Sequence, residues 1–151
     1  MNTYIGVDVA KTTGIAIICF DGGLVLTHCD RYEAVSLLVQ LIEGCSNVVI
    51  GLEEQKSFGG IRTSYQAGLS QGIVEGGLLA NKIPYRLIPI QKWQRKLLGK
   101  FPKGESKIKA KQFVNKLYPE VITKSQDEID ALCIAVYLRE ISAGNLSNIK
   151  G

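Results

Sequence analysis

The stretch SQDEIDALCIAVYLRE, residues 125–140, predicts the element around which the rest of this chain folds. From Ala131 to Leu138 it is apolar on every side, which is typical of a helix buried in a core. It nevertheless begins with Asp127 and Asp130, whose three-residue spacing places both carboxylates on one helix face. An ionised carboxylate is strongly unfavourable in a core without a positive partner, so we expect cations to meet these two.

Around this helix the sequence predicts one α/β domain. The length of 151 residues suits a single domain, residues 1–151, with a tail from about residue 142 that we expect to fray. Alternating and β-rich runs separated by short turns predict an antiparallel meander of three strands. The full order expected is three strands, a helix, a strand, a long helix, a strand, basic helical sequence and the last helix, over about residues 3–9, 14–20, 24–30, 32–42, 47–53, 61–80, 85–90, 91–118 and 125–140.

Composition excludes several classes of protein. An apolar fraction of 46% excludes a disordered chain, and no apolar run reaches the roughly 18 residues that a membrane span needs. The N-terminus lacks a basic segment and carries Asp8, so we expect no signal peptide and a cytoplasmic location. The four cysteines lie far apart without a CxxC pair, which favours reduced thiols over a zinc site. Because His28 is the only histidine, a mechanism that uses a histidine as the general base is disfavoured.

Positive charge is concentrated in one segment. The net charge is only +4, but residues 91–116 hold half of the 18 basic side chains against the single acid Glu105. Trp93, Phe101 and Phe113 lie between them. One interpretation is a solvated helical face; the scarcity of acids and the aromatic residues favour a surface that binds a polyanion, most readily nucleic acid. The basic residues are Lys92, Arg95, Lys96, Lys100, Lys103, Lys107, Lys109, Lys111 and Lys116.

Further acids end or interrupt predicted strands. Asp8 lies in the first strand, although aspartate is a poor strand former, and Glu53 and Glu54 end the fourth. Structural alternatives exist: Asp8 could turn the chain, the two glutamates could be solvated, and a capping box from Ser125 to Glu128 would account for Asp127. Converging carboxylates repel one another unless cations share them, and Mg²⁺ prefers such oxygen ligands together with phosphates. Two such ions can hydrolyse a phosphodiester without a histidine.

Three motifs resemble one family. IGVDVAKTTGIAI (5–17), GLEEQKSF (51–58) and DEIDALCIA (127–135), in this order and spacing, look like the RuvC family of Holliday junction resolvases, over residues 3 to 140. The resemblance, closest to the phage branch, implies a ribonuclease H-like fold with a mixed five-stranded sheet flanked by helices. It also implies two Mg²⁺ ions per site, with Mn²⁺ able to substitute, bound by four acids: Asp8, Glu53, Asp127 and Asp130.

The second acid and the DNA-contacting residues follow the family pattern less closely. Bacterial members show Glu followed directly by Gln, a pattern that would select Glu54 as the second acid. Other relatives show Glu-x-Gln, which selects Glu53. We choose Glu53, because only from this residue does the family pattern align without a gap to residues 69–72. Lys107 matches the lysine near the scissile phosphate and is assigned to catalysis with the four acids. The aromatic wedge of the bacterial members has no direct match, because position 56 is lysine. The residues expected to bind nucleic acid are Phe58, Arg62, Lys92, Arg95, Lys96, Lys100, Lys103, Lys109 and Lys111.

The resemblance implies a metal-dependent, structure-selective endodeoxyribonuclease that resolves Holliday junctions, or related branched DNA such as forks or flaps, by paired nicks. Such an enzyme would serve recombination and repair in the cytoplasm of a bacterium or a phage-infected cell, with no membrane partner. Two alternatives remain open: a branched-nucleic-acid-binding module without catalysis, and an ATPase fragment of the actin and sugar-kinase type, whose first phosphate motif residues 5–17 also resemble.

The helix at 61–80 predicts a homodimer. It carries small residues at four-residue intervals, so that one face is nearly bare backbone, at Ser64, Gly68, Gly72, Gly76 and Ala80. Interior glycines disfavour a helix by about 1 kcal/mol each relative to alanine, so close packing must offset them. We expect a second subunit against the bare face; the alternative is that this face lies on the protein's own sheet. An apolar surface is predicted on the other side, from Tyr65, Leu69, Ile73 and Leu79.

Overall fold

Five strands form one mixed sheet in the order β3-β2-β1-β4-β5. The computed structural model describes residues 1–56, 59–121 and 125–149. β1, β2 and β3 form the predicted antiparallel meander, and β4 pairs parallel to both β1 and β5. The elements are β1 (Thr3–Asp8), β2 (Thr12–Ile18), β3 (Leu24–Asp30), α1 (Ala34–Ile42), β4 (Val48–Glu54), α2 (Ile61–Ala80), β5 (Arg86–Pro89), α3 (Ile90–Leu98), α4 (Ser106–Leu117) and α5 (Gln126–Ile149).

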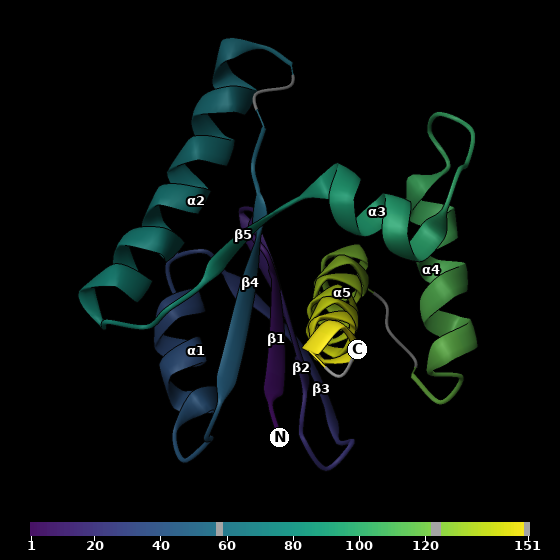
Figure 1. The fold of residues 1–151 in the computed structure, drawn as a ribbon. Helices are drawn as coiled ribbons and strands as arrows, with labels where there is room; N and C mark the ends of the chain where they lie inside the picture. Colours follow the sequence, from purple (N-terminus) through teal and green to yellow (C-terminus); the bar gives the residue numbers. More distant parts are fainter. Residues whose placement is uncertain (57–58, 122–124, 150–151) are drawn as a thin grey trace.

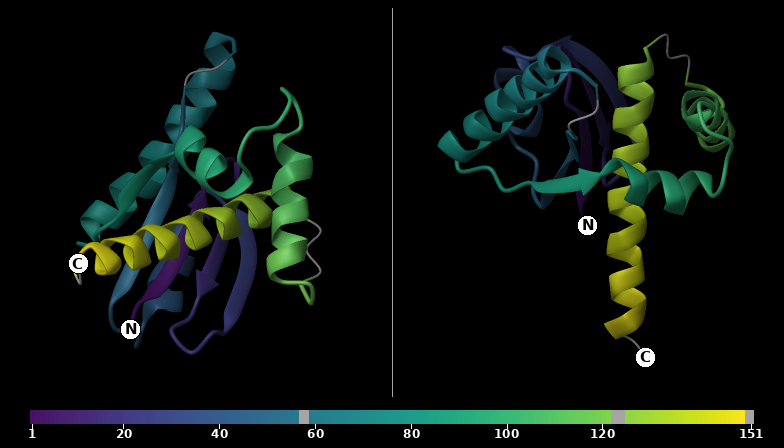
Figure 2. Two further views of the ribbon diagram at one scale, coloured as in Figure 1. Left: turned by 45° about the vertical axis from the view of Figure 1, so that its right-hand side comes forward. Right: turned by 90° about the horizontal axis from the view of Figure 1, so that it is seen from above.

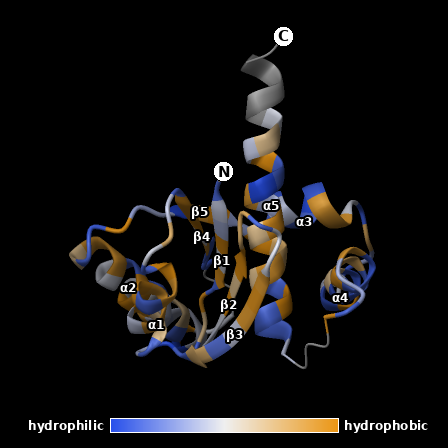
Figure 3. Cartoon of the chain, turned by 90° about the horizontal axis from the view of Figure 1, so that it is seen from below, coloured by the Kyte–Doolittle hydropathy of each residue, from blue (hydrophilic) through white to orange (hydrophobic). Residues whose placement is uncertain are grey.

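The sheet separates two layers of helices. α1 and α2 cover one face, and α5 crosses the other with α3 and α4 outside it (Figures 1 and 2). Two hydrophobic cores result, one between the sheet and α1 and α2, the other around α5. In Figure 3 the middle of α5 is hydrophobic and its first turn hydrophilic, as the sequence of that helix predicts. No helix in the described ranges is both long and apolar enough to cross a membrane.

Strand alternation assigns each side chain of β1 and β4 to one layer. Ile5 and Val7 of β1 pack in the core under α1 and α2, and so do Ile50 and Leu52 of β4. The residues between them, which include Gly6 and Asp8 on β1 and Gly51 and Glu53 on β4, therefore face α5. The acids of these two strands thus lie on the face that α5 covers.

Glycines let α5 lie unusually close to the sheet. A Cβ added to Gly6 would collide with the backbone of α5 at Ala131, and one added to Gly14 would collide with the backbone of Asp127. A Cβ on Gly51 would come within 2.9 Å of Leu138. Three adjacent strands therefore contribute bare backbone beneath α5. This approach brings the first turn of the helix down to the ends of the strands.

The C-terminal half differs from the sequence prediction in two respects. The basic segment is not one continuous helix, because Gly99 and Gly104 adopt left-handed φ values of 71° and 89° on either side of Pro102, separating α3 from α4. The tail that we expected to fray from about residue 142 continues α5 as far as Ile149. The long helix projects beyond the sheet (Figure 2).

The glycine face of α2 does not pack on this chain. Ser70, Val74 and Leu78 form the buried face of the helix. Nothing lies within 4 Å of a Cβ built on Gly68, Gly72 or Gly76, so the alternative that this face rests on the protein's own sheet is wrong. The prediction of a second, packed apolar face is also wrong within this chain: Tyr65 and Leu79 are exposed by 64% and 65%, and the helical spacing places them on the same outward side as the glycines, with Ile61.

Candidate active site

The four predicted acids meet at one edge of the sheet. Asp8 is the last residue of β1 and Glu53 lies near the end of β4. The parallel register, which pairs Val7 with Leu52, continues to make Asp8 and Glu53 neighbours. Both side chains are buried under the first turns of α5, which carry Asp127 and Asp130. Residues more than a hundred positions apart in sequence thus reach one place because β1, β4 and α5 converge there.

Burial and like charge both disfavour ionisation of Asp8. Burial raises the pKa of the Asp8 carboxyl well above its usual range, and the hydrogen bond to Glu53 raises it further. The negative charges of Glu53, Asp130 and Asp127 act in the same direction. A hydrogen bond between two carboxyl groups requires a proton, and the raised pKa of Asp8 favours that proton on its side chain.

Asp130 is held in a similar but milder environment. Burial is the largest cause that raises the pKa of Asp130 to about 6, with further increases from Glu53 and Asp127. Two groups oppose it. The side-chain amide of Gln126 donates a 2.8 Å hydrogen bond to Asp130 Oδ1, and the positive charge of Lys107 lowers the pKa. Lys107 is therefore near enough for its charge to act on Asp130.

The cluster is one of uncompensated acids. Within the described residues no lysine or arginine forms an ion pair with Asp8 or Glu53. As the side chains stand, no three His, Cys, Asp or Glu residues in the described ranges are arranged to hold one metal ion. The chemistry of the donor set nevertheless suits a hard divalent cation, because it comprises four carboxylates from three elements, two of them buried. Binding would require the side chains to turn toward the ion.

The structure distinguishes the two neighbouring glutamates. Glu53 is 5% exposed and contacts Asp8, whereas Glu54 is half-buried and points to the opposite face because strand side chains alternate. The chain then continues to Gln55, whose backbone N–H donates to Gln71 Oε1 at 2.7 Å. Gln71 in turn donates to Glu75. This places Glu53 with the other acids and ties the end of β4 to α2.

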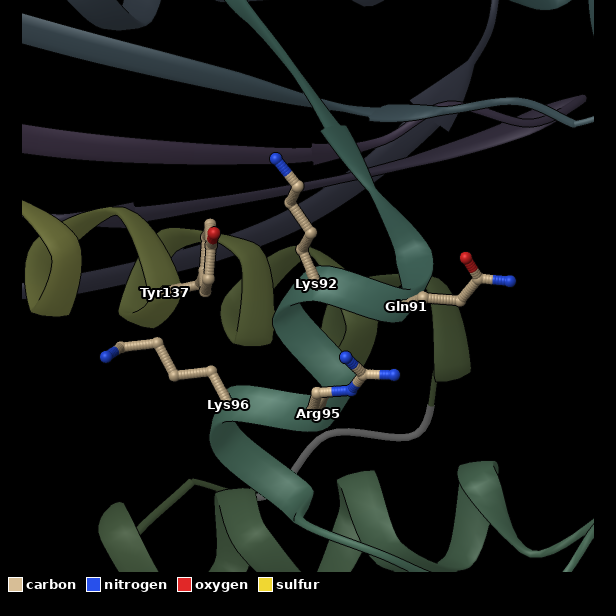
Figure 4. A pocket seen from close by; sticks show the side chains of 5 residues that line it. All are labelled: Gln91, Lys92, Arg95, Lys96 and Tyr137. Carbon is tan, nitrogen blue, oxygen red and sulfur yellow. The ribbon is translucent and has the colours of Figure 1, made fainter.

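The predicted basic surface lies on α3 and α4. Lys92, Arg95 and Lys96 line a hollow of about 380 Å³ with Tyr137 of α5 (Figure 4). Lys92 and Lys96 leave α3 on the Tyr137 side, and Arg95 points the other way. Arg95 also lines an adjoining hollow of about 680 Å³ with Lys100 and Phe101.

Other residues assigned to nucleic acid lie elsewhere or are buried. Lys103 and Lys111 are exposed and Lys109 is half-buried, while Arg62 lies on α2, on the opposite side of the sheet from α3 and α4 (Figure 1). Phe58 lies outside the described residues. Of the three aromatic residues of the basic segment, Trp93 is 1% exposed and Phe113 is half-buried against the core around α5.

One contact near the acids has no sequence signal. Nδ1 of His28, on β3, lies 2.7 Å from Oε1 of Glu128, in the first turn of α5. The two residues are 100 positions apart, so no local motif could have linked them. Only the register of the sheet brings them together.

Comparison with known proteins identifies the fold. No protein-family model matches this chain, and no curated protein sequence matches it. Among solved structures, Thermus thermophilus RuvC aligns with a TM-score of 0.67 at 16% identity, covering 88% of this chain and 90% of that one. The T. thermophilus RuvC complex with a Holliday junction substrate aligns at 0.66 and 13% identity, covering 88% and 90%. The fowlpox virus resolvase bound to Holliday junction DNA aligns at 0.54 and 13% identity, covering 93% and 99%.

Proposed function

The chain has the ribonuclease H-like fold of RuvC-type resolvases, and on this fold we propose that it is a Mg²⁺-dependent endonuclease that cuts Holliday junctions or closely related branched DNA. The observation that carries the proposal is the contact of the buried Asp8 with Glu53, under the charges of Asp127 and Asp130. Four clustered acids, of which Asp8 and Glu53 form no ion pair with a lysine or arginine among the described residues, lower the stability of a fold, and a bound cation would offset that cost.

Asp8, Glu53, Asp127 and Asp130 would hold the ions, with Mn²⁺ able to replace Mg²⁺. Bound Mg²⁺ would supply an activated water and would stabilise the leaving oxygen of the phosphodiester. The chain itself contributes three things. Asp8 would bind the ion as its carboxylate, Gln126 orients Asp130 through its hydrogen bond, and Lys107 would stabilise negative charge at the scissile phosphate.

The basic hollows on α3 would hold the DNA backbone. Exposed lysines and arginines release counterions when they neutralise phosphates, so binding should weaken steeply as salt increases. Lys92, Arg95, Lys96 and Lys100 supply the charge, and Phe101 adds an aromatic surface next to Arg95. Replacing Lys107, Lys109 and Lys111 with alanine should flatten the salt dependence, since all three lie on α4.

The working unit would be a homodimer joined through the outward face of α2. That face combines bare glycine backbone with exposed apolar side chains, Ile61, Tyr65 and Leu79, which is the composition of a surface that a second helix covers. A hollow of about 370 Å³ beside Gly68 and Gly72 adds concave surface. A two-fold dimer presents two identical sites, as two symmetric nicks require. Light scattering should give about 33 kDa, twice the 16.5 kDa chain mass.

A direct test uses end-labelled four-way junction, replication fork, flap, linear duplex and RNA–DNA hybrid, each with Mg²⁺ and with EDTA. The proposal predicts Mg²⁺-dependent cleavage of a branched DNA in preference to linear duplex, and no cleavage by Asp8→Asn. Binding of the junction without cleavage at any Mg²⁺ or Mn²⁺ concentration would instead support a non-catalytic DNA-binding module. Equal cleavage of every substrate would remove the structural selectivity.

A further inference from the structure

Three residues lie in one row across the sheet next to the acids. Asp8 of β1 pairs with Gly14 of β2, and Gly14 pairs with His28 of β3. Residues directly opposite in neighbouring strands point to the same face, so His28 shares the α5 face with Asp8. Gly14, between them, has no side chain.

The first turn of α5 occupies the space over Gly14. A Cβ on Gly14 would collide with the backbone of Asp127, so this turn rests directly on β2. On one side it presents Asp127 and Asp130 to Asp8, whose pKa both of them raise. Glu128 lies between them in sequence, and at about 100° per residue it leaves the helix in a different direction from both. Its carboxylate meets His28 at 2.7 Å.

We infer that His28 is a positioning residue, which acts through Glu128 to fix the first turn of α5 and so sets Asp127 and Asp130 for the divalent cation. The inference rests on the proposed function for the cation site and for the identity of the reaction. His28 belongs to the edge strand β3 and is 55% exposed, whereas Glu128 is 14% exposed, so the rigid sheet holds a largely buried group of the helix. A second tie on the far side of Gly14 prevents the turn from rotating about its contact with β2.

Loss of the contact between His28 and Glu128 should lower the affinity of the site for the cation. Ligand positions must be held to within about 0.5 Å for a productive site, and loss of supporting contacts typically lowers metal affinity by about 10- to 100-fold. Without the tie, Asp127 and Asp130 would still be present but would spend less time in the binding geometry. We therefore expect loss of the contact to weaken the cation site about tenfold, and to leave the DNA surface on α3 unchanged.

The test compares His28→Leu, which removes the hydrogen bond, with His28→Asn, whose amide nitrogen can take the place of Nδ1. Mn²⁺ binding to the metal-free protein is measured by titration calorimetry. The Mg²⁺ concentration for half-maximal junction cleavage and the junction Kd in EDTA are measured in parallel. His28→Leu should weaken Mn²⁺ binding and raise the half-maximal Mg²⁺ about tenfold, with the Kd for the junction within twofold of wild type. His28→Asn should restore most of both losses.

Glu128→Ala completes a double-mutant cycle. It should weaken Mn²⁺ binding at least as much as His28→Leu does, and the double variant should be no worse than Glu128→Ala alone, because the contact with His28 is then already lost. If His28→Leu does not fold, as judged by circular dichroism, the decision falls to His28→Asn and Glu128→Ala. Normal Mn²⁺ binding by His28→Leu would overturn the inference. So would a harmless Glu128→Ala together with an inactive His28→Asn, because His28 would then act on the DNA itself.

Different results would refute the proposed nuclease function and the proposed role of His28. A wild-type protein that binds Mn²⁺ but cuts no branched DNA would refute the proposed function, and the role of His28 would then be decided by the Mn²⁺ titrations of its variants. A wild-type protein that binds neither Mn²⁺ nor Mg²⁺ would refute both.

Discussion

Glycines are used in opposite ways in two regions of this molecule. Beneath α5, Gly6 and Gly14 lie so close to the helix backbone that no side chain fits. On the outward face of α2, Gly68, Gly72 and Gly76 have nothing within 4 Å of an added Cβ. In the first region the absence of side chains lets α5 pack directly on the sheet, so that its first turn reaches the strand ends. In the second, the space they leave is still open for another molecule.

The two groups of glycines therefore serve different purposes: one brings the acids together within a chain, and the other leaves a surface for the proposed dimer. Close contact at Gly14 brings Asp127 and Asp130 to Asp8, so the acids meet within one chain. The bare face of α2 contributes nothing to the fold of that chain, since its buried face is formed by Ser70, Val74 and Leu78. Substitutions in the two regions should therefore have effects of opposite kind.

The largest effect is expected for Gly14→Ala. The new methyl group would meet the backbone of Asp127, which has no flexible side chain to move aside, so the free energy of unfolding should fall by about 3 kcal/mol or more. Gly72→Ala is the matched control and should raise the stability of the monomer by up to about 1 kcal/mol, because alanine favours a helix. Urea unfolding at low protein concentration measures both. Equal effects of the two substitutions would remove the distinction between the regions.

Gly72→Leu should dissociate the proposed dimer while the monomer remains folded. A leucine at this open position meets nothing in its own chain but would fill the surface that a second copy needs, so the dimer Kd should rise at least about 100-fold. Gly77→Leu is the contrasting variant, since a Cβ at Gly77 would lie 2.5 Å from Val35 Cγ2 of the same chain, and it should lower the melting temperature instead. Light scattering and thermal melts separate the two outcomes. A Gly72→Leu dimer as tight as wild type would place the interface elsewhere.

A smaller effect is expected of pH on the stability of the metal-free protein. The raised pKa values of Asp8 and Asp130 mean that the folded state favours their protonated forms. For Asp130 this stabilisation is complete below the unfolded pKa of 3.8 and is lost as the pH rises through about 6. In EDTA the protein should therefore melt at a higher temperature at pH 5.5 than at pH 7.5, and Asp8→Asn should raise the melting temperature at pH 7.5, because burial disfavours the ionised carboxylate. Mg²⁺ at pH 7.5 should stabilise the wild type and not Asp8→Asn.

The sequence predicted the strands, the long helices and the four acids, because these depend on periodicity and on local motifs such as DEIDALCIA. It could not predict which glycines would be packed, since Gly14 and Gly72 look alike until the position of α5 is known. Trp93 was misassigned to the surface for the same reason. Trp93 lies at a helical spacing that suits either surface or core, and the docking of α3 on α5 buries it. The contact of His28 with Glu128 depends entirely on the register of β3.

The choice between Glu53 and Glu54 shows what a fold adds to a motif. Motif spacing favoured Glu53 and kept Glu54 in reserve, and the alternation of β4 assigns Glu53 to the face under α5 and Glu54 to the other. The two differ by one position in the chain and have the same chemistry. They are therefore the best matched pair in the molecule for testing whether the acids under α5 are the catalytic ones.

The most direct measurement is the rate of four-way junction cleavage in Mg²⁺ by Glu53→Gln and Glu54→Gln, with junction binding in EDTA as the control for folding. An amide keeps the shape of the carboxylate but loses the charge that holds a cation, so Glu53→Gln should cut roughly 100-fold more slowly or not at all while binding the junction normally. Glu54→Gln should cut within about twofold of wild type, because its side chain lies on the other face. An active Glu53→Gln with an inactive Glu54→Gln, or two fully active variants, would contradict the assignment of the active site to the acids beneath α5.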